Sequence, residues 1–157
     1  MYKEINKEEW KSGMSSGSYS GKQEHVRNLD LPKLEVVENK FQDIEFTSKL
    51  ITKEMNSVCP KTGLPDFGTI ELSYIPNKVV IEEKSFKMYL TAYRNIGIFK
   101  EFATANIFKD FIEACKPKWG KIHVHWLERG GISSDIYIMF DGKKMFGIKN
   151  EENNNIK

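Results

Sequence analysis

Two segments of this chain combine residue types that could carry out covalent chemistry or bind an anion. The first is a turn-rich stretch over residues 57–68, which contains Cys59 and Asp66. A cysteine presented by a loop can act as a nucleophile once its thiolate is stabilised, and Lys61 could supply positive charge. Asp66 could fold back in the same loop and shuttle a proton. Composition alone leaves a plainer interpretation open, in which Cys59 is a small buried hydrophobe and Asp66 a turn residue.

The second segment begins with Glu82 and has Lys84, Ser85 and Lys87 near a predicted helix start. Helix N-termini and lysines favour anionic groups, so this segment could bind a phosphate-bearing ligand. The alternative is a charged, solvated first turn, which the sequence by itself favours. The chain has no GxGxxG motif, so a Rossmann-type nicotinamide site is not supported.

Other reactive residues have simpler structural explanations. Cys115 completes a helical apolar face just before Pro117, which predicts packing rather than chemistry. His123 and His125 fall on the same face of a predicted strand, but no third ligand is near them, so no metal site is predicted. Arg129 precedes two glycines, and this group could be a backbone anion site or a hairpin turn.

The strands that must position these residues follow from the hydrophobic pattern. A long strand is predicted over residues 41–55, before the Cys59 loop. Alternation of apolar and polar residues over 69–74 predicts a second strand after that loop. A turn and a short β-branched run over 79–81 follow.

Helical spacing begins after this run. Four apolar residues recur at i, i+3, i+4 and i+7 and therefore share one face of a helix: Phe86, Tyr89, Leu90 and Tyr93. A second helix is predicted from about residue 101 to Pro117. Alternation returns over 122–127, and residues 132–140 form a last predicted strand.

The order of two strands, two helices and two strands (ββααββ) predicts an α+β domain, in which a four-stranded antiparallel sheet carries both helices on one face. The domain is expected over residues 41–148, with a partly mobile N-terminal arm over 1–40 and a disordered tail over 149–157. Such a sheet has long exposed edges, and residues 135–140 carry apolar side chains on both faces. Both features favour edge-to-edge assembly of several copies.

Composition argues against several classes of protein. The chain has 157 residues, a formal net charge of +2 and no basic stripe, so no nucleic-acid partner is expected. Its apolar runs are too short to span a bilayer and no secretory signal opens it, so we expect a cytoplasmic protein without a membrane partner. Its two cysteines are expected to be reduced thiols.

Several linked motifs resemble those of one enzyme family. Residues 59–67 are similar to the nucleophile loop of the 7-cyano-7-deazaguanine reductases of queuosine biosynthesis, a tRNA modification pathway; this is the QueF family. Residues 82–89 resemble its cofactor motif, and further matches follow in order at 94–101 and 129–133. The resemblance covers residues 41–141 and implies a tunnelling fold, in which subunits join their sheets into a ring barrel with active sites at subunit interfaces. Chains of this short type are associated with homo-oligomers, namely pentamers that often stack into decamers.

The resemblance also implies a function and a role for each site residue. The family reduces the nitrile of 7-cyano-7-deazaguanine to an aminomethyl group, a four-electron reaction that consumes two NADPH. Cys59 would form a covalent thioimide with the nitrile carbon, Asp66 would protonate the nitrogen, and Glu101 would hold the base. The implied cofactor-binding residues are Glu82, Lys84, Ser85, Lys87 and Tyr89, with Arg129 as a weaker addition.

Three residues depart from the family pattern. Lys100 stands where the family usually has a histidine beside the base-binding glutamate, and Ile96 replaces a second common histidine. Because a lysine can also donate hydrogen bonds, Lys100 is expected to replace that histidine in part at the substrate site. Ala103 replaces a cysteine that in some members forms a protective disulfide with the nucleophile, so this regulation is not expected here.

Three rival functions remain compatible with these residues. A relative of the family could capture the nitrile on Cys59 without reducing it efficiently. An enzyme of the same fold could form an amidine or act as a pterin-type cyclohydrolase. Amidine-forming relatives, however, lack the cofactor motif that this chain has, and a cyclohydrolase calls for a metal. A non-enzymatic interaction module would leave the loop from Cys59 to Asp66 unexplained. Nitrile reduction is therefore the predicted function.

Overall fold

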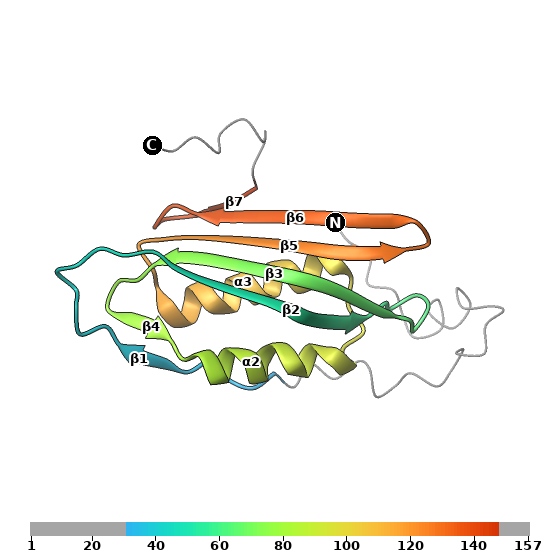
Figure 1. The fold of residues 1–157 in the computed structure, drawn as a ribbon, viewed down its shortest axis with the longest axis horizontal. Coiled ribbons are helices and arrows are strands. Elements are labelled where there is room, and N and C mark those ends of the chain that lie inside the picture. The colour runs from blue at the N-terminus through green and yellow to red at the C-terminus, as the bar shows by residue number, and fades with distance from the viewer. Residues whose placement is uncertain (1–30, 148–157) are drawn as a thin grey trace.

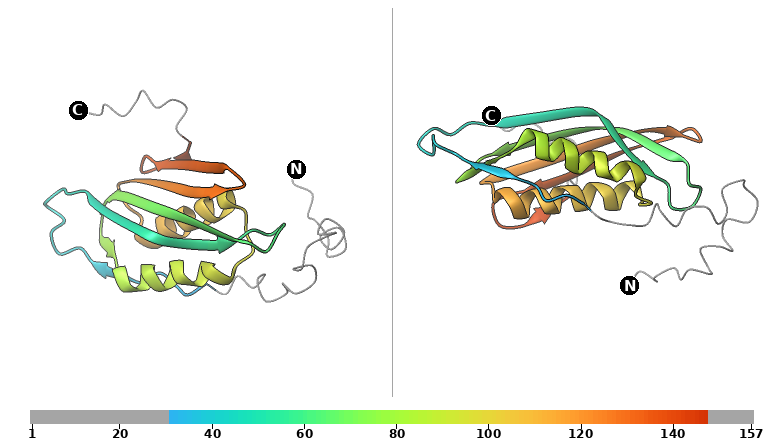
Figure 2. Two further views of the ribbon diagram at one scale, coloured as in Figure 1. Left: turned by 45° about the vertical axis from the view of Figure 1, so that its right-hand side comes forward. Right: turned by 90° about the horizontal axis from the view of Figure 1, so that it is seen from below.

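A five-stranded antiparallel sheet forms the centre of the structure, a computed structural model that describes residues 31–147. In the order in which they pair, its strands are β2 (Ser48–Val58), β3 (Pro65–Ile75), β5 (Trp119–Arg129), β6 (Ile132–Phe140) and β7 (Met145–Phe146). Two helices, α2 (Glu83–Ala92) and α3 (Lys100–Cys115), lie on the same face of this sheet (Figures 1 and 2). A short 3₁₀ helix, η2 (Tyr93–Asn95), follows α2. No helix in residues 31–147 is long and apolar enough to cross a membrane.

A second, smaller sheet joins β1 (Val36–Glu38) to β4 (Val79–Ile81) in antiparallel register. Buried Asn39 fixes the chain here, because its side chain donates to the Asn77 carbonyl at 3.0 Å and accepts from the Phe41 N–H at 3.1 Å. The last part of the expected N-terminal arm therefore pairs with the domain. Residues 1–30 of that arm, and the expected tail over 149–157, lie outside the described residues.

The core lies between the sheet and the two helices. Burial alternates along β3 and β5, so that every second side chain points toward the helices. The largest fully buried side chains include Trp126 and Tyr74 from the sheet and Phe108 and Phe111 from α3. Burial of each such side chain contributes about 1.5–3 kcal/mol to folding. The opposite face of β3 and β5 is partly exposed.

Both helices have clear end signals. The Glu82 carboxylate caps α2, accepting the backbone N–H groups of Lys84 at 2.9 Å and Ser85 at 2.6 Å. Helix α3 ends at Cys115, where Lys116 adopts a left-handed conformation with φ of 44° and Pro117 prevents continuation. The predicted helical faces of both helices are confirmed as the buried ones.

The predicted α+β class with two helices and an antiparallel sheet is confirmed, and the long elements follow the predicted order, but the four-stranded count is wrong. The chain reverses after β6 because the Asp141 carboxylate accepts the N–H groups of Lys143 and Lys144, and β7 then pairs with the end of β6. The first long strand also starts at Ser48 rather than at residue 41. The apolar residues before Ser48 are exposed, so they do not belong to a core strand even though they are hydrophobic.

Candidate active site

A backbone bridge brings the start of α3 to the end of β2. Val58 and Gly97 form an isolated parallel β-bridge, in which the Val58 N–H donates to the Ile96 carbonyl at 2.9 Å. The segment that leads into α3 therefore lies directly beside the end of β2. As a result Lys100, the first residue of α3, reaches the loop that begins with Cys59.

A cavity of about 210 Å³ opens where these segments meet. Its walls come from the Cys59 loop, the start of α3 and the turn between β5 and β6. The lining residues are Cys59, Pro60, Asp66, Phe99, Lys100, Glu101, Arg129, Ile132 and Ser134. The structure thus brings together the predicted catalytic and substrate-binding residues, and adds Arg129 to them.

The loop that carries Cys59 is a tight turn between β2 and β3. The Cys59 N–H donates to the Leu64 carbonyl at 2.8 Å, and the Gly63 N–H donates to the Cys59 carbonyl at 2.8 Å. Gly63 adopts φ of 70°, a left-handed conformation that favours glycine. These bonds hold Cys59 at the cavity wall, with 3% of the residue exposed.

The surroundings of Cys59 favour the thiolate. Burial by itself raises the pKa of this thiol, but hydrogen bonds from the Thr62 side chain and from the backbone N–H groups of Thr62 and Lys61, with a further one from Arg129, lower it below its ordinary value. The Lys61 residue is exposed, so the cation near the sulfur is Arg129 rather than the Lys61 ammonium proposed from the sequence. In contrast, burial raises the pKa of Cys115 to about 12, in agreement with a packing role.

Asp66 is a buried carboxylate with two cationic neighbours. It is 3% exposed, and it pairs with Ser57 across the β2–β3 ladder. Its Oδ1 atom lies 3.6 Å from the Lys100 Nζ and 3.4 Å from the Arg129 Nη1, yet it accepts no hydrogen bond within the described part of the chain. A buried oxygen in this condition is available to a proton or to a ligand in the cavity.

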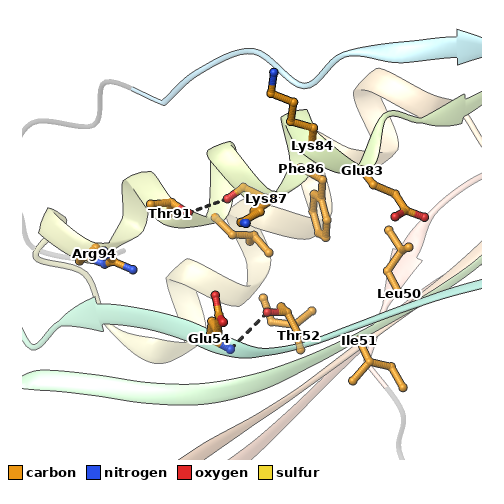
Figure 3. A pocket seen from close by; sticks show the side chains of 12 residues that line it. Leu50, Ile51, Thr52, Glu54, Glu83, Lys84, Phe86, Lys87, Thr91 and Arg94 are labelled. Atoms are coloured by element: carbon orange, nitrogen blue, oxygen red, sulfur yellow. Dashed lines mark hydrogen bonds between the residues drawn. The ribbon is translucent and has the colours of Figure 1, made fainter.

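A second cavity, of about 560 Å³, lies between α2 and β2 (Figure 3). Lys84, Lys87 and Arg94 line it, together with Glu54 and Glu83 and an apolar floor that includes Phe86. Two of the predicted cofactor-binding residues, Lys84 and Lys87, therefore share one groove. No role was predicted for Arg94, which follows α2 in η2 and joins the two lysines in the lining of the groove.

Three other residues of the predicted cofactor set are occupied inside the fold. Glu82 caps α2, and the Ser85 hydroxyl accepts the Glu35 N–H at 2.9 Å and thereby holds the segment that leads into β1. Tyr89 is 2% exposed, and its hydroxyl donates to the Asp110 Oδ2 at 2.6 Å, which links α2 to α3. Burial, with the nearby Tyr93 and Asp110, raises the pKa of Tyr89. None of the three lines either cavity.

The histidine pair lies on the polar face of the sheet, opposite the helices. His123 and His125 both hydrogen-bond the same Asp135 oxygen, at 2.7 Å and 3.0 Å. His123 also stacks on Tyr137, with ring centroids 4.2 Å apart. In residues 31–147 no group of three or more His, Cys, Asp or Glu residues has an arrangement that could hold a metal ion.

Comparison with known proteins identifies the family. A family model described as QueF-like protein matches residues 65–144. The NADPH-dependent 7-cyano-7-deazaguanine reductase of Chloroherpeton thalassium is 47% identical over 111 residues, which cover 71% of this chain and 96% of the relative. The chain belongs to the QueF-like family.

Further relatives of this QueF-like protein carry the same printed name. The NADPH-dependent 7-cyano-7-deazaguanine reductase of Chlorobaculum tepidum is 44% identical over 111 residues, and that of Elusimicrobium minutum is 38% identical over 133 residues and matched over its entire length, 100%. Among solved structures, the archaeosine synthase QueF-Like in the apo form matches with a TM-score of 0.57 at 23% identity, covering 62% of this chain and 96% of that one. This match shows the fold, which is the predicted tunnelling fold.

Proposed function

We propose that this QueF-like protein is an NADPH-dependent oxidoreductase that reduces the nitrile of 7-cyano-7-deazaguanine to an aminomethyl group. Relatives at 38–47% identity carry that name. One structural observation supports the chemistry: Cys59, Asp66, Lys100 and Glu101 line a single cavity. The archaeosine synthase neighbour, at 23% identity, supports the fold without favouring amidine formation.

Cys59 would begin the reaction as a nucleophile. Its lowered pKa increases the fraction of thiolate near neutral pH, and the thiolate attacks the nitrile carbon to form a C–S bond. Negative charge then develops on the nitrile nitrogen, and Asp66 delivers a proton to it. The product of this step is a thioimide covalently attached to Cys59.

Lys100 would resupply the proton that Asp66 delivers. Its Nζ lies 3.6 Å from Asp66 Oδ1 and donates to the Leu127 carbonyl at 3.3 Å, so the ammonium is held next to the carboxylate. Reduction of a nitrile to an amine takes up protons at the nitrogen more than once, and a fixed lysine can provide them in turn. In this role Lys100 would replace the family histidine in part.

Glu101 would select the substrate. It lies in the first turn of α3, at the rim of the same cavity. A carboxylate can accept two parallel N–H bonds, such as those offered by the amino group and ring N–H of a guanine-like base. Because α3 also carries Lys100, the helix would fix the base and the proton relay relative to Cys59 together.

The groove between α2 and β2 fits a phosphate-bearing cofactor. Lys84, Lys87 and Arg94 supply positive charge along one helical face, as the phosphates of NADPH require. NADPH, when bound, supplies the hydride for the reduction. Glu82, Ser85 and Tyr89 would contribute by fixing the position of α2, which carries the two lysines.

The complete enzyme is proposed to be a ring of this chain, a pentamer or a stacked decamer. The outer edge of β2 has no partner strand among residues 31–147, and β7 pairs only with Met139 and Phe140 of β6. On this side residues 132–136 of β6 have no partner strand among residues 31–147, and two open edges on one sheet favour head-to-tail pairing of copies.

Nicotinamide absorbance tests the proposed function. The purified protein is mixed with 7-cyano-7-deazaguanine and NADPH, beside a Cys59→Ala variant and a Cys115→Ala variant. We expect oxidation of about two NADPH per nitrile, lost with Cys59→Ala and kept with Cys115→Ala, because Cys115 only packs in the core. Absence of oxidation by the unmodified chain would refute the proposal.

A further inference from the structure

The guanidinium of Arg129 contacts Thr62 in the Cys59 loop and Asp66 at the start of β3. Its Nη1 donates to the Thr62 hydroxyl oxygen at 3.4 Å and lies 3.4 Å from Asp66 Oδ1. Arg129 lines the same cavity as Cys59 and is absent from the lining of the groove that contains Lys84 and Lys87. We propose that Arg129 is a positioning residue that orients the Thr62 hydroxyl toward the Cys59 sulfur and holds Asp66 beside it. This inference deepens the proposed function, on which its catalytic meaning rests.

The hydrogen bonds of Thr62 explain how Arg129 can act on the sulfur. A hydroxyl group offers one donor and two acceptor positions. The Thr62 oxygen accepts from the Leu64 N–H at 3.2 Å and from Arg129 at 3.4 Å, so both acceptor positions are occupied. The remaining O–H is left to donate, and in the proposed arrangement it donates to the Cys59 sulfur, where such a bond lowers the thiol pKa.

The backbone around Arg129 directs its side chain toward the Cys59 loop. The ladder between β5 and β6 is irregular between Trp126 and Arg129, and irregularities of this kind redirect side chains. Arg129 then pairs with Ile132 across a two-residue turn, in which Gly130 and Gly131 have φ of 62° and 78°. The turn thus directs the guanidinium to the loop, and the two glycines are explained by the hairpin.

The charged groups around Cys59 determine how its pKa would change in a variant. The charged side chains that line its cavity are Asp66, Lys100, Glu101 and Arg129. Only Arg129 also contacts Thr62, so removal of Arg129 perturbs the hydrogen bond to the sulfur as well as the local charge. A variant of Thr62 that lacks the hydroxyl removes the hydrogen bonds of this side chain and leaves the local charge unchanged.

The test is the rate of Cys59 alkylation by iodoacetamide as a function of pH, with the modified peptide identified by mass spectrometry. It uses the full chain and four variants, Arg129→Met, Arg129→Lys, Thr62→Val and the double variant Arg129→Met/Thr62→Val. In Arg129→Met we expect the midpoint of the pH profile to rise, with a roughly five- to tenfold slower reaction at neutral pH. Arg129→Lys should show a smaller shift, because a lysine keeps the charge without the planar fork.

The double variant separates a linked role from two independent ones. If Arg129 acts through Thr62, the double variant should match the larger single effect rather than the sum of both. An unchanged pH midpoint in Arg129→Met would overturn the proposal, and so would an unchanged midpoint accompanied by a raised KM for NADPH. Should Arg129→Met fail to fold, the pH midpoints of Arg129→Lys and Thr62→Val decide instead, and unchanged midpoints in both would overturn the proposal. Alkylation needs neither nitrile nor NADPH, so failure of the reductase assay is distinguishable from failure of this inference.

Discussion

At the scale of single residues, the two cysteines show how environment decides reactivity. Both are buried, yet Cys59 receives hydrogen bonds from its own loop, whereas Cys115 is surrounded by the apolar core of α3. Hydrogen bonds to the charged form lower a thiol pKa, and burial alone raises it. The same residue type is therefore poised for chemistry at one position and inert at the other.

The pH dependence of alkylation should separate the two thiols. The pKa of Cys59 is lowered from an ordinary value of 9.0, so its thiolate persists to lower pH and disappears only as the pH falls through the lowered value. The pKa of Cys115 is raised to about 12, so this thiol stays protonated across the physiological range. Peptide mapping after iodoacetamide treatment should show Cys59 modified first, with a midpoint below pH 9.0. Faster labelling of Cys115 in the folded protein would contradict this assignment.

Lys100 offers a second test at this scale. If it resupplies the proton that Asp66 delivers, Lys100→Ala should lower the steady-state rate about a hundredfold, the lower end of general acid–base contributions. The Cys59 adduct should still form, because attack by the thiolate does not require Lys100. Lys100→His should retain most of the activity. Unchanged turnover in Lys100→Ala would rule out this role.

Sequence could predict most of the site residues but not all their contacts. Cys59 and Asp66 were identifiable because both fall in one turn-rich stretch of the sequence, although the structure places Asp66 on β3. Glu101 and Lys100 were identifiable from the family resemblance. The contact of Arg129 with that loop depends on an irregular pairing of β5 with β6, and no hydrophobic period reveals such an irregularity. Tyr89 carried two conflicting signals, an apolar helical face and a cofactor motif. The structure places it in the core.

At the scale of elements, β3 and β5 must lie close together to position the site. Gly68 pairs with Trp126, two residues after Asp66 and three before Arg129. A Cβ at Gly68 would meet the His125 carbonyl oxygen at 2.8 Å and the Trp126 ring at 3.2 Å. Glycine is therefore required at this point for the two strands to bring Asp66 and Arg129 into contact.

Replacing two glycines with alanine, one at a time, should separate the steric requirement at Gly68 from any general effect of replacing a glycine. Gly68→Ala should reduce the free energy of unfolding by about 1–3 kcal/mol, because backbone or a packed indole must move. Gly120→Ala is the matched control, since its Cβ would meet its nearest neighbours at 3.5 Å, an ordinary contact. Chemical denaturation of both variants measures the difference. Equal stability of the two variants would contradict the account of the β3–β5 contact.

The elements that escaped prediction are short or formed between distant segments. β7 has two residues and β1 and β4 have three each, too few to show a period. Pairing of β1 with β4 joins residues more than 40 positions apart, and no local signal specifies it. Phe41, Ile44 and Phe46 are exposed apolar residues before β2. Because they are hydrophobic, the predicted strand began too early in the sequence.

At the scale of the whole molecule, the two cavities of one chain are separate. Cys59 lines one, and Lys87 lines the other. Thr52, in the groove, and Cys59 are seven positions apart on or beside β2, which corresponds to roughly 23 Å along a strand. In the proposed ring, the groove of one chain can serve the Cys59 cavity of its neighbour.

Mixed rings test this arrangement. Chains carrying Cys59→Ala and chains carrying Lys87→Met should each be inactive alone. Co-expression with two affinity tags and tandem purification should give mixed rings with measurable NADPH oxidation, because some interfaces combine an intact Cys59 with an intact Lys87. The matched control is Cys59→Ala with Glu101→Gln, whose sites share one cavity in one chain and should not complement. Failure of the first mixture to regain activity would place the complete site within one chain.

The intact mass of the protein after incubation with 7-cyano-7-deazaguanine in the absence of NADPH shows most directly whether Cys59 is the nucleophile. We predict a mass increase equal to the whole nitrile compound, located on the peptide that contains Cys59 and absent from Cys59→Ala. Addition of NADPH should remove the adduct and release the aminomethyl product. Formation of that product by the Cys59→Ala variant, with no adduct on the unmodified chain, would contradict the assignment of Cys59 as the nucleophile.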